Sequence, residues 1–327
     1  MKQSVFAPLL GGVLLAVTLV PAVVLADETA LTARQWLERM SQAAHQLDYD
    51  GTFVYSHDGH MQTMRIVHSS RDGTERERLL SLSGPPREVI RNNDKVTCIL
   101  PDDNEVVEES TGPARRLPMD LPRRLATLER HYSFRDGGDE RVAGHAARKI
   151  LITPLDRYRY GHALWLHQDK GLLLRSELYN EEGRVVEQLM FTALEFHEAL
   201  PPSLLEPETR GRDVVWQRGG ELPEWHDAAD LWAVGELPPG FMLENHRHHF
   251  MAGSNAQVEH LLFSDGLASV SVFIEPEDER RDGFVGGLRL GAVNSFTRSH
   301  NGYLITVMGE VPPVTARRIA ESVALRN

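Results

Sequence analysis

Asp-Gly and Asn-Gly dipeptides recur along this chain, several of them between β-prone runs. Asp-Gly begins at positions 50, 58, 72, 136, 265 and 282, and Asn-Gly begins at position 301. These dipeptides tolerate the positive φ angles of two-residue hairpin turns, so they are the strongest short-range signal for a β-hairpin. Strands joined this closely are antiparallel, because parallel strands need long crossover connections. The chain is therefore predicted to fold largely into antiparallel sheets.

One helix is expected before the first strands. Apolar residues recur at helical spacing over residues 32–47, and Thr32 is a suitable N-cap. The members of this apolar stripe are Trp36, Met40, Ala43, Ala44 and Leu47. After this helix the pattern changes to the period of two that is typical of half-buried strands.

Three later runs are apolar on consecutive residues: 150–152 (ILI), 172–174 (LLL) and 189–191 (LMF). Both faces of such strands must avoid water. A curved sheet wrapped round the first helix, with an apolar concave interior, would satisfy this requirement. A plain two-layer core would satisfy it equally well, so the pattern leaves both interpretations open.

Residues 1–26 are typical of a cleaved secretion signal. Lys2 supplies a weak positive charge near its start, an apolar run follows, and Val24 and Ala26 are the small residues at the -3 and -1 positions that signal peptidase prefers, which places cleavage before Asp27. A membrane anchor is the alternative, but Gly11, Gly12 and Pro21 interrupt a run that is already short for a span. Export is therefore predicted.

Residues 201–222 are rich in proline and glycine, which is typical of a linker. The linker separates residues 27–200 from a second unit of residues 223–327. In this second unit we expect a hairpin around Asp265-Gly266, two strands around Asn301-Gly302, a strand over 241–250 and a final helix after Pro312-Pro313 that carries Ile319 and Val323. Two domains are consistent with a chain of 327 residues.

Composition and motifs exclude several functions. The chain has 35 Lys and Arg against 47 Asp and Glu, and this acidity argues against nucleic-acid binding, which needs clustered cations. The single cysteine, Cys98, precludes an intramolecular disulfide and a multi-cysteine zinc site, and its apolar run favours a buried thiol. No nucleophile elbow, phosphate-binding loop, dinucleotide fingerprint or HExxH motif is present, so we predict no catalytic residues, no cofactor and no enzyme activity.

Two clusters of side chains have open interpretations. His246, His248 and His249 could ligate a metal if they lie on a strand, but no third ligand is marked nearby, so a polar strand edge is favoured and no metal is predicted. The basic residues Arg115, Arg116, Arg123 and Arg124 flank a proline-rich loop. Their guanidinium groups could dock an anionic partner or lipid phosphate, or could simply be solvated.

The chain resembles the MucB/RseB family of periplasmic regulators of an envelope-stress sigma factor of the sigma-E/AlgU type. The stretches that carry this resemblance are 49–55 (YDGTFVY), 87–91 (REVIR), 131–134 (HYSF), 264–276 (SDGLASVSVFIEP), 291–294 (GAVN) and 309–313 (GEVPP). The resemblance extends over the whole mature chain.

The resemblance implies an α+β fold. Residues 27–200 would form an open half-barrel of antiparallel strands over helices, similar to the lipoprotein carriers LolA and LppX, and would sense lipids. Residues 223–327 would form a smaller α+β domain that binds an anti-sigma factor. This expectation favours the apolar-interior interpretation of the consecutive apolar runs.

The resemblance also implies a function. Such a protein binds the periplasmic segment of a MucA/RseA-like, membrane-spanning anti-sigma factor and shields it from site-1 proteolysis. It releases that segment when it senses acyl groups of lipid, lipopolysaccharide or lipoprotein. Self-association into a homodimer or higher oligomer is also implied. The alternative function is a periplasmic carrier of lipid or lipoprotein of the LolA type.

Strand parity and this resemblance together suggest residues for the two binding functions. The predicted apolar cleft consists of Phe53, Tyr55, Met64, Ile66, Ile150, Ile152, Trp165, Leu172, Leu174 and Met190. Parity does not establish which face of each strand is which, so ordinary core packing stays open for about half of them. The four arginines between 115 and 124 are the predicted site for docking an anion or partner.

Overall fold

The computed structural model describes residues 31–93, 95–100, 105–110, 125–207, 215–218, 231–250, 257–277 and 284–326. Residues 32–327 form one compact unit. The predicted secretion signal, residues 1–26, lies outside the described residues. So do the four predicted docking arginines, Arg115, Arg116, Arg123 and Arg124.

Helix α1 (Ala33–Gln46) begins where the sequence predicts it. The Thr32 hydroxyl accepts a hydrogen bond from the backbone N–H of Gln35, and the Gln35 side chain accepts one from the backbone N–H of Thr32. This reciprocal capping box satisfies two backbone donors that a helix start leaves unpaired. Trp36 and Met40 lie on the buried side of the helix, which confirms the predicted apolar stripe.

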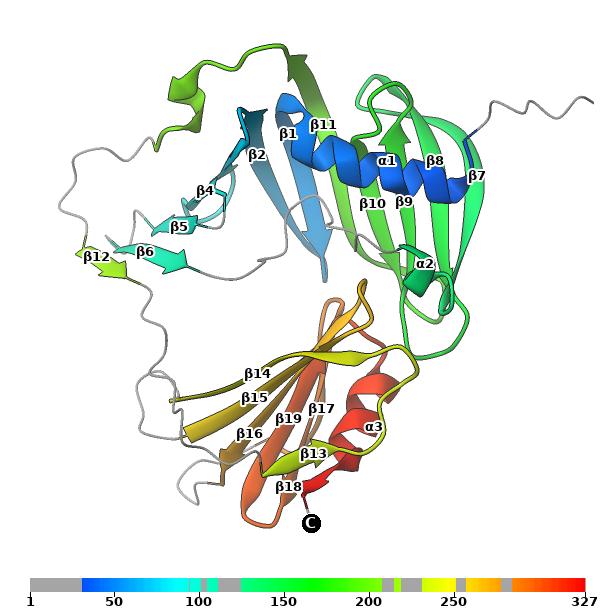
Figure 1. The fold of residues 1–327 in the computed structure, drawn as a ribbon, viewed down its shortest axis with the longest axis vertical. Helices are drawn as coiled ribbons and strands as arrows, with labels where there is room; N and C mark the ends of the chain where they lie inside the picture. The colour runs from blue at the N-terminus through cyan, green and yellow to red at the C-terminus, as the bar shows by residue number, and fades with distance from the viewer. Residues whose placement is uncertain are drawn as a thin grey trace, which may run out of the picture. The chain divides into compact units, whose positions relative to one another are not determined.

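Twelve of the described strands form one open sheet in the order β12-β6-β5-β4-β3-β2-β1-β11-β10-β9-β8-β7. Their bounds are β1 (Asp48–His57), β2 (His60–Arg71), β3 (Thr74–Ser81), β4 (Glu88–Asn92), β5 (Lys95–Leu100), β6 (Glu105–Ser110), β7 (Tyr132–Val142), β8 (His145–Pro154), β9 (Gly161–His167), β10 (Leu173–Tyr179), β11 (Val185–His197) and β12 (Val215–Arg218). Helix α1 crosses one face of this sheet (Figure 1). The short helix α2 (Leu125–Leu128) precedes β7, and a 3-10 turn, η1 (Pro202–Leu205), packs beside β2 and β3.

The predicted Asp-Gly and Asn-Gly hairpins are largely confirmed. Asp58 and Asp72 have φ angles of 48° and 50°, and the glycines that follow them have φ angles of 75° and 74°. Two successive positive φ angles match the twist of the flanking strands, β1–β2 and β2–β3. Asn301 and its glycine make the same turn between β18 and β19.

The second sheet contains six of the described strands, in the order β14-β15-β16-β19-β18-β17. The elements of this part are β13 (Trp232–Val234), β14 (Met242–Phe250), β15 (Gln257–Ser264), β16 (Ser269–Pro276), β17 (Gly286–Leu290), β18 (Val293–His300), β19 (Tyr303–Gly309), α3 (Pro313–Ser322) and β20 (Val323–Leu325). Its own core joins Val272 and Val307 of the sheet to Ile319 of α3 and Trp232 of β13. The α+β fold class, with an open sheet and a separate smaller sheet, is therefore confirmed.

Three details differ from the sequence expectations. Strand β12 pairs with β6 in parallel, because it reaches the sheet through a long connection rather than a hairpin. The segment 201–222, predicted to be a linker, contains both η1 and β12. Helix α3 ends at Ser322, so Val323 is not helical: it begins β20 and pairs with Val234.

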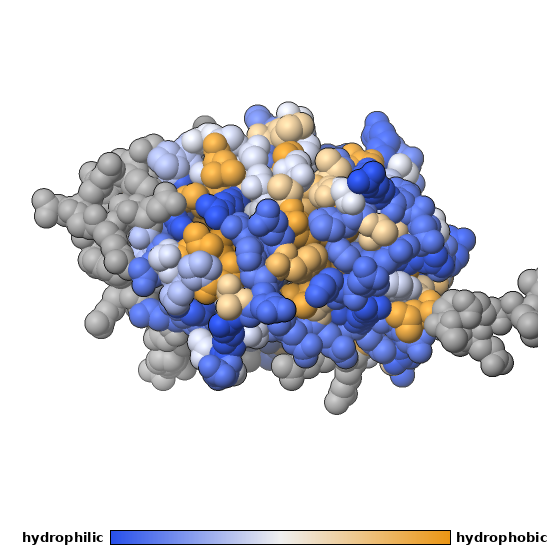
Figure 2. All heavy atoms as spheres, turned by 90° about the horizontal axis from the view of Figure 1, so that it is seen from above, coloured by the Kyte–Doolittle hydropathy of each residue, from blue (hydrophilic) through white to orange (hydrophobic). Residues whose placement is uncertain are grey.

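The described helices include none that is long and apolar enough to cross a membrane. On the face in Figure 2, apolar side chains lie in small groups between hydrophilic ones. Cys98 lies half-buried on β5.

Candidate functional site

The strand register assigns the predicted cleft residues to the two faces of the first sheet. Directly opposed residues share a face. Tyr55 opposes Leu189, Leu189 opposes Ser176, Ser176 opposes Leu164, and Leu164 opposes Ile150. Tyr55 and Ile150 therefore lie on the same face, on strands β1 and β8. By alternation and by direct pairing, the same face carries Phe53, Met64, Ile66 and Ile152.

Helix α1 covers this face. Ala43 of α1 belongs to the same apolar cluster as Phe53, Met64 and Ile66. The predicted residues here are almost fully buried, since Phe53 and Ile66 are 1% exposed and Met64 is 4% exposed. Of the other predicted residues on this face, Ile150 and Ile152 are buried and Tyr55 is half-buried. The structure thus gathers Phe53, Met64 and Ile66 in one cluster with Ala43 of α1, and acyl binding in this cluster stays a prediction.

Trp165 and Met190 lie on the opposite face, because Trp165 opposes Arg175 and Arg175 opposes Met190. The Arg175 guanidinium lies 4.3 Å from the centroid of the Trp165 ring, and the Lys149 ammonium lies 4.6 Å from it. The indole N–H donates a 2.7 Å hydrogen bond to Glu140. This bond, together with Lys149, lowers the pKa of the Glu140 carboxyl. Trp165 therefore lies among charged partners on the sheet face opposite Phe53, although both side chains belong to one apolar cluster.

Leu172 and Leu174, the last two predicted cleft residues, are fully buried. They flank Leu173 where the pairing of β9 with β10 shifts register. A β-bulge of this kind interrupts the alternation of side chains between faces. Parity counted along the sequence therefore does not assign these two residues to a face.

A buried histidine lies on the α1 side of the sheet. His68 is 1% exposed, and its ring stacks on Tyr49 with the centroids 5.1 Å apart. Its Nδ1 lies 2.7 Å from the Leu47 carbonyl oxygen, and its Nε2 lies 3.2 Å from a Glu75 carboxylate oxygen. Since both ring nitrogens face acceptors, only the imidazolium can donate to both. Desolvation alone would lower the pKa of His68, but the hydrogen bonds to Glu75 and Leu47, with the nearby Glu77 charge, raise it overall.

We expect His68 to make stability depend on pH. The folded-state pKa is raised above the unfolded value of about 6.5, so the native state retains the proton to higher pH. Its stabilising contribution is fully present below about pH 6.5 and is lost as the pH rises through the folded-state pKa. Urea unfolding of the wild type and of His68→Gln, from about pH 5 to about pH 9, should show a difference that shrinks with rising pH.

The exposed His60 provides the matched control for this measurement. Its variant His60→Gln should show the same stability as the wild type at each pH, because the substitution removes no buried contact. A difference between wild type and His68→Gln that grows with rising pH would contradict the assignment.

A second group of buried polar side chains joins the first sheet to the second. Asp265, in the turn between β15 and β16, is fully buried. Its Oδ2 accepts hydrogen bonds from the Tyr132 hydroxyl at 2.9 Å and from Nε of Arg159 at 2.5 Å. Its Oδ1 accepts the backbone N–H groups of Leu267 at 2.9 Å and Ala268 at 2.8 Å. The Asp265 carboxylate therefore binds the backbone of its own hairpin and also binds Tyr132 and Arg159, which belong to the first sheet and its β8–β9 loop.

Arg159, in the loop between β8 and β9, has no solvent exposure of its side chain. Besides Asp265, its guanidinium donates to the Asp156 carboxylate and to the Pro239 carbonyl oxygen. Its guanidinium carbon also lies 5.1 Å from the centroid of the Phe241 ring. Burial alone would lower the pKa of Arg159, but the hydrogen bond and charge of Asp265 raise it overall, so the cation is retained.

The Tyr132 hydroxyl is kept protonated in this contact. Burial raises the pKa of Tyr132 far above its ordinary value, and the Asp265 charge raises it further. The phenol therefore remains a donor to Asp265 at neutral pH. Together with the Arg159 cation, it compensates the cost of burying the carboxylate.

Two further close approaches belong to the same contact. The Asn294 side-chain amide donates to the Tyr160 hydroxyl at 2.7 Å and to the Val311 carbonyl oxygen at 2.8 Å. Gly240 has a φ of +91°, and a Cβ at this position would lie 2.3 Å from Nε2 of His131. Only glycine fits both that backbone conformation and that proximity.

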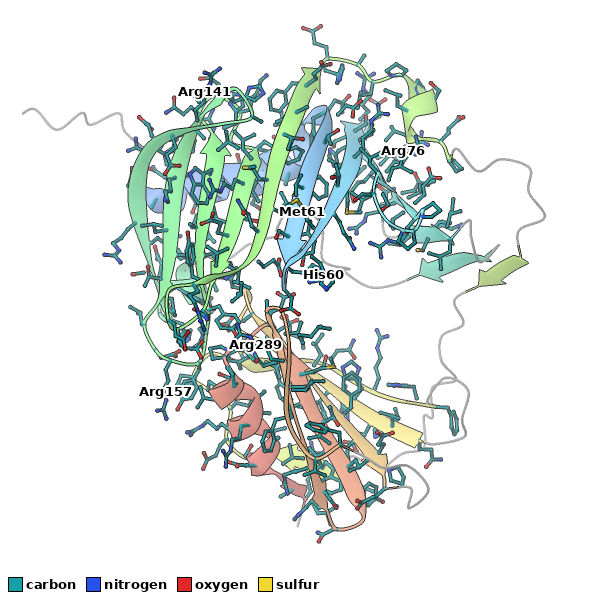
Figure 3. The ribbon with its side chains drawn as sticks, turned by 180° about the vertical axis from the view of Figure 1, so that it is seen from behind. His60, Met61, Arg76, Arg141, Arg157 and Arg289 are labelled. Atoms are coloured by element: carbon teal, nitrogen blue, oxygen red, sulfur yellow. The ribbon has the colours of Figure 1, made fainter. Side chains whose placement is uncertain are left out.

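A surface groove lies beside this contact, near Arg157 (Figure 3). The residues that line it are Arg157, Tyr158, Gly235, Glu236, Val314, Arg317, Arg318, Glu321 and Ser322. Several of their charges compensate one another, since Arg318 pairs with Glu236 at 2.8 Å and Arg317 pairs with Glu321 at 2.7 Å. The groove is therefore an unconvincing site for a strongly charged ligand.

The domain-model comparisons identify the family. A model of the MucB/RseB N-terminal domain matches residues 32–209, and a model of the MucB/RseB C-terminal domain matches residues 226–324. The chain belongs to the MucB/RseB family. Sequence and structure comparisons place known MucB/RseB proteins among its relatives over most of its length.

Two curated relatives illustrate the range of similarity. The sigma factor AlgU regulatory protein MucB of Pseudomonas aeruginosa is 35% identical over 314 residues, which cover 93% of both chains. The sigma-E factor regulatory protein RseB of Haemophilus influenzae is 27% identical over 321 residues, which cover 92% of this chain and 94% of the relative.

Two solved structures of the family align with 90% of the length of this chain and with 99% of the length of their own chains. The crystal structure of MucB in complex with MucA(peri) has a TM-score of 0.71 at 32% identity. The complex structure of Pseudomonas aeruginosa MucA/MucB has a TM-score of 0.73 at 33% identity.

Three stretches that carry the MucB/RseB resemblance meet in the buried polar contact. Tyr132 lies in 131–134, Asp265 lies in 264–276, and Asn294 lies in 291–294. Their partners Arg159 and Tyr160 were not singled out from the sequence. The sequence showed that all three stretches resemble the MucB/RseB family. It did not show that they contact one another in the folded protein.

Proposed function

We propose that this chain binds the periplasmic segment of a MucA/RseA-like anti-sigma factor and shields it from site-1 proteolysis. The observation that carries the proposal is the match, over 90% of this chain, to structures of MucB in complex with MucA. The names of the curated relatives, which describe regulators of a sigma factor, support the same regulatory function. A secretion signal at residues 1–26 would deliver the chain to the periplasm, where it would meet that segment.

The second sheet offers a surface for this partner. Helix α3 packs on the face that carries Val272 and Val307. Leu288 opposes Ser295, and Ser295 opposes Met308, so these residues lie on the other face. Leu288 is 61% exposed and Met308 is 39% exposed, and Leu290 on the same edge strand is 65% exposed. Exposed apolar residues on an edge strand favour binding of an extended peptide segment.

The test is protection of the anti-sigma segment. The purified mature chain is mixed with the soluble periplasmic segment, and cleavage by the site-1 protease is followed over time. We expect slower cleavage with the wild type. The double variant Leu288→Ser/Leu290→Ser should bind more weakly, while its exposed positions preserve the fold.

Met61→Ser is the matched control for this experiment, because Met61 is 70% exposed but lies on the first sheet (Figure 3). It should protect as well as the wild type. The absence of both binding and protection with purified wild-type components would refute the proposed function. Equal binding by the double variant would instead refute this surface alone.

The proposal includes release of the partner by a lipid-type signal. A ligand that binds the unoccupied regulator more tightly than the complex must weaken the complex by the same factor. We place acyl recognition in the apolar cluster beneath α1, and a change in orientation between the two sheets would have to break the buried contact around Asp265. In the protection assay, addition of lipopolysaccharide fragments should then restore cleavage.

A further inference from the structure

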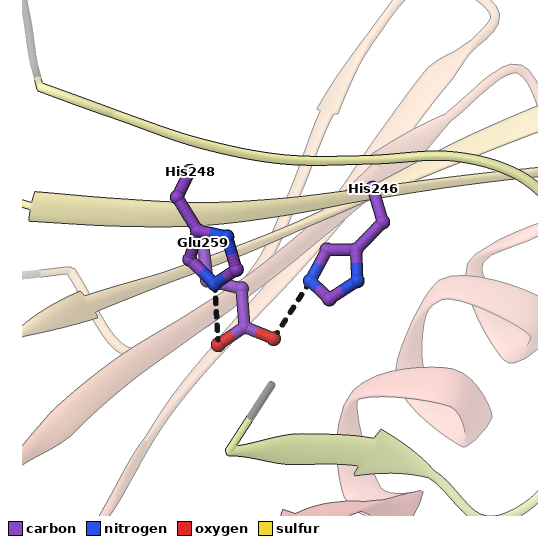
Figure 4. A group of neighbouring side chains, drawn as sticks. All are labelled: His246, His248 and Glu259. Atoms are coloured by element: carbon purple, nitrogen blue, oxygen red, sulfur yellow. Dashed lines mark hydrogen bonds and ion pairs between the residues drawn. The ribbon is translucent and has the colours of Figure 1, made fainter. Parts of the chain in front are cut away.

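Three potential metal ligands converge on the second sheet. His246 and His248 are two residues apart on β14, so their side chains lie on the same face. Glu259 on β15 directly opposes His248 in the strand register. Its Oε1 lies 3.0 Å from Nε2 of His246, and its Oε2 lies 3.6 Å from Nε2 of His248 (Figure 4). All three ligand atoms lie within 4.8 Å of one another.

The carboxylate of this group lies in an apolar environment. Glu259 shares a face of β15 with Leu261 and Phe263, which belong to the core of the second sheet. Its side chain is 8% exposed, and those of His246 and His248 are 16% and 15% exposed. A carboxylate removed from water needs a compensating positive charge. Two imidazole rings, those of His246 and His248, lie within ion-pair distance of the Glu259 carboxylate.

The spacing and chemistry of these atoms fit a divalent transition metal. Zinc binds imidazole nitrogen and carboxylate oxygen at about 2.0–2.2 Å, so neighbouring ligand atoms in a tetrahedral site lie roughly 3.3 Å apart. Oε1 of Glu259 lies 3.0 Å from Nε2 of His246, close to that value, and the other oxygen, Oε2, lies 3.6 Å from Nε2 of His248. Two imidazoles and one carboxylate form a donor set that zinc uses with solvent at a remaining position.

We propose that His246, His248 and Glu259 form a zinc-binding site. Zinc would bind the Glu259 carboxylate together with the two imidazoles and would join the edge strand β14 to β15. The sequence favoured a polar strand edge for the histidines because it marked no third ligand. The register of β14 on β15 supplies that ligand. This site is independent of the proposed binding of an anti-sigma factor.

Metal binding by the full mature chain, produced without a histidine tag, tests the proposal. Calorimetry with zinc should give one site per chain, and cobalt substitution should give the visible absorption bands of a tetrahedral ion. His246→Ala and His248→Ala should each weaken zinc binding at least about tenfold, and Glu259→Gln should do the same. Zinc should also raise the unfolding temperature of the wild type but not of these variants.

His249→Ala is the matched control, because His249 follows directly on β14 but points to the other face, where its ring lies 6.1 Å from that of His260. It should bind zinc as the wild type does. Circular dichroism in chelator verifies that each variant is folded, and the two histidine variants decide the outcome if Glu259→Gln does not fold. Wild-type binding no tighter than that of the His246→Ala/His248→Ala double variant, or equal loss in His249→Ala, would overturn the proposal.

Discussion

Replacing Asp265 with asparagine is expected to destabilise the protein by about 3–5 kcal/mol, the range for breaking a buried ion pair. The Asp265 carboxylate accepts from four donors, two at each oxygen. An asparagine amide has only one acceptor oxygen. If that oxygen faces the backbone N–H groups of Leu267 and Ala268, the amide N–H₂ faces the N–H of Arg159. If the amide is reversed, the backbone donors lose their acceptor, so no orientation satisfies all four donors.

The measurement is urea unfolding followed by tryptophan fluorescence. Trp165 in the first sheet and Trp232 in the second part are each 1% exposed, so fluorescence reports on both regions. A double-mutant cycle with Arg159→Met isolates the pairwise interaction between the two side chains. We expect the double variant to lose much less unfolding free energy than the two single variants lose in sum. The reason is that the double variant leaves neither Asp265 nor Arg159 as a buried charge without the other.

The exposed pair of Arg317 and Glu321 on α3 provides the control. These side chains are 64% and 52% exposed and lie 2.7 Å apart. Arg317→Ala should cost no more than about 0.5 kcal/mol, because solvent screens exposed pairs. If Asp265→Asn costs as little as this control, the buried contact does not contribute to stability as the geometry indicates.

The local turns and caps were predictable because their causes are local. Asp58-Gly59 and Asn301-Gly302 adopt the positive φ angles that these dipeptides tolerate, and Thr32 caps α1 through a residue three positions away. The turn at Ala143-Gly144 was missed, although Ala143 has a φ of 49°. Alanine seldom adopts this conformation, so only the pairing of β7 with β8 imposes it.

The functional groupings were not predictable, because they depend on strand register between distant residues. Asp265 bonds with Arg159, 106 positions away, and Glu259 reaches His248 only through the pairing of β14 with β15. A one-residue change in register would exchange the faces of a strand. Bulges such as the one at Thr52/Phe53 add further shifts that a count along the sequence cannot include.

Phe53→Ala is expected to cost about 3–5 kcal/mol if the cluster beneath α1 is packed core. Phe53 is 1% exposed, opposes Met64, and lies 5.7 Å from the Phe191 ring between centroids. Removing its ring leaves a cavity that neighbours on two strands cannot easily fill, so stability falls by the lost burial and by the cavity. Urea unfolding measures this loss, and Met61→Ala, at a 70% exposed position of the same hairpin, should change stability by less than about 0.5 kcal/mol.

The same variant separates the two interpretations that the consecutive apolar runs left open. A fluorescent fatty-acyl probe is added to wild type and to Phe53→Ala under conditions where both are folded. If the cluster is also an acyl site, the wild type binds the probe, lipopolysaccharide fragments displace it, and the variant changes the affinity. If the wild type does not bind the probe while Phe53→Ala loses several kcal/mol, the residues beneath α1 are core alone. The lipid signal would then have to be recognised elsewhere on the chain, and the release step of the proposed function would lose its structural support.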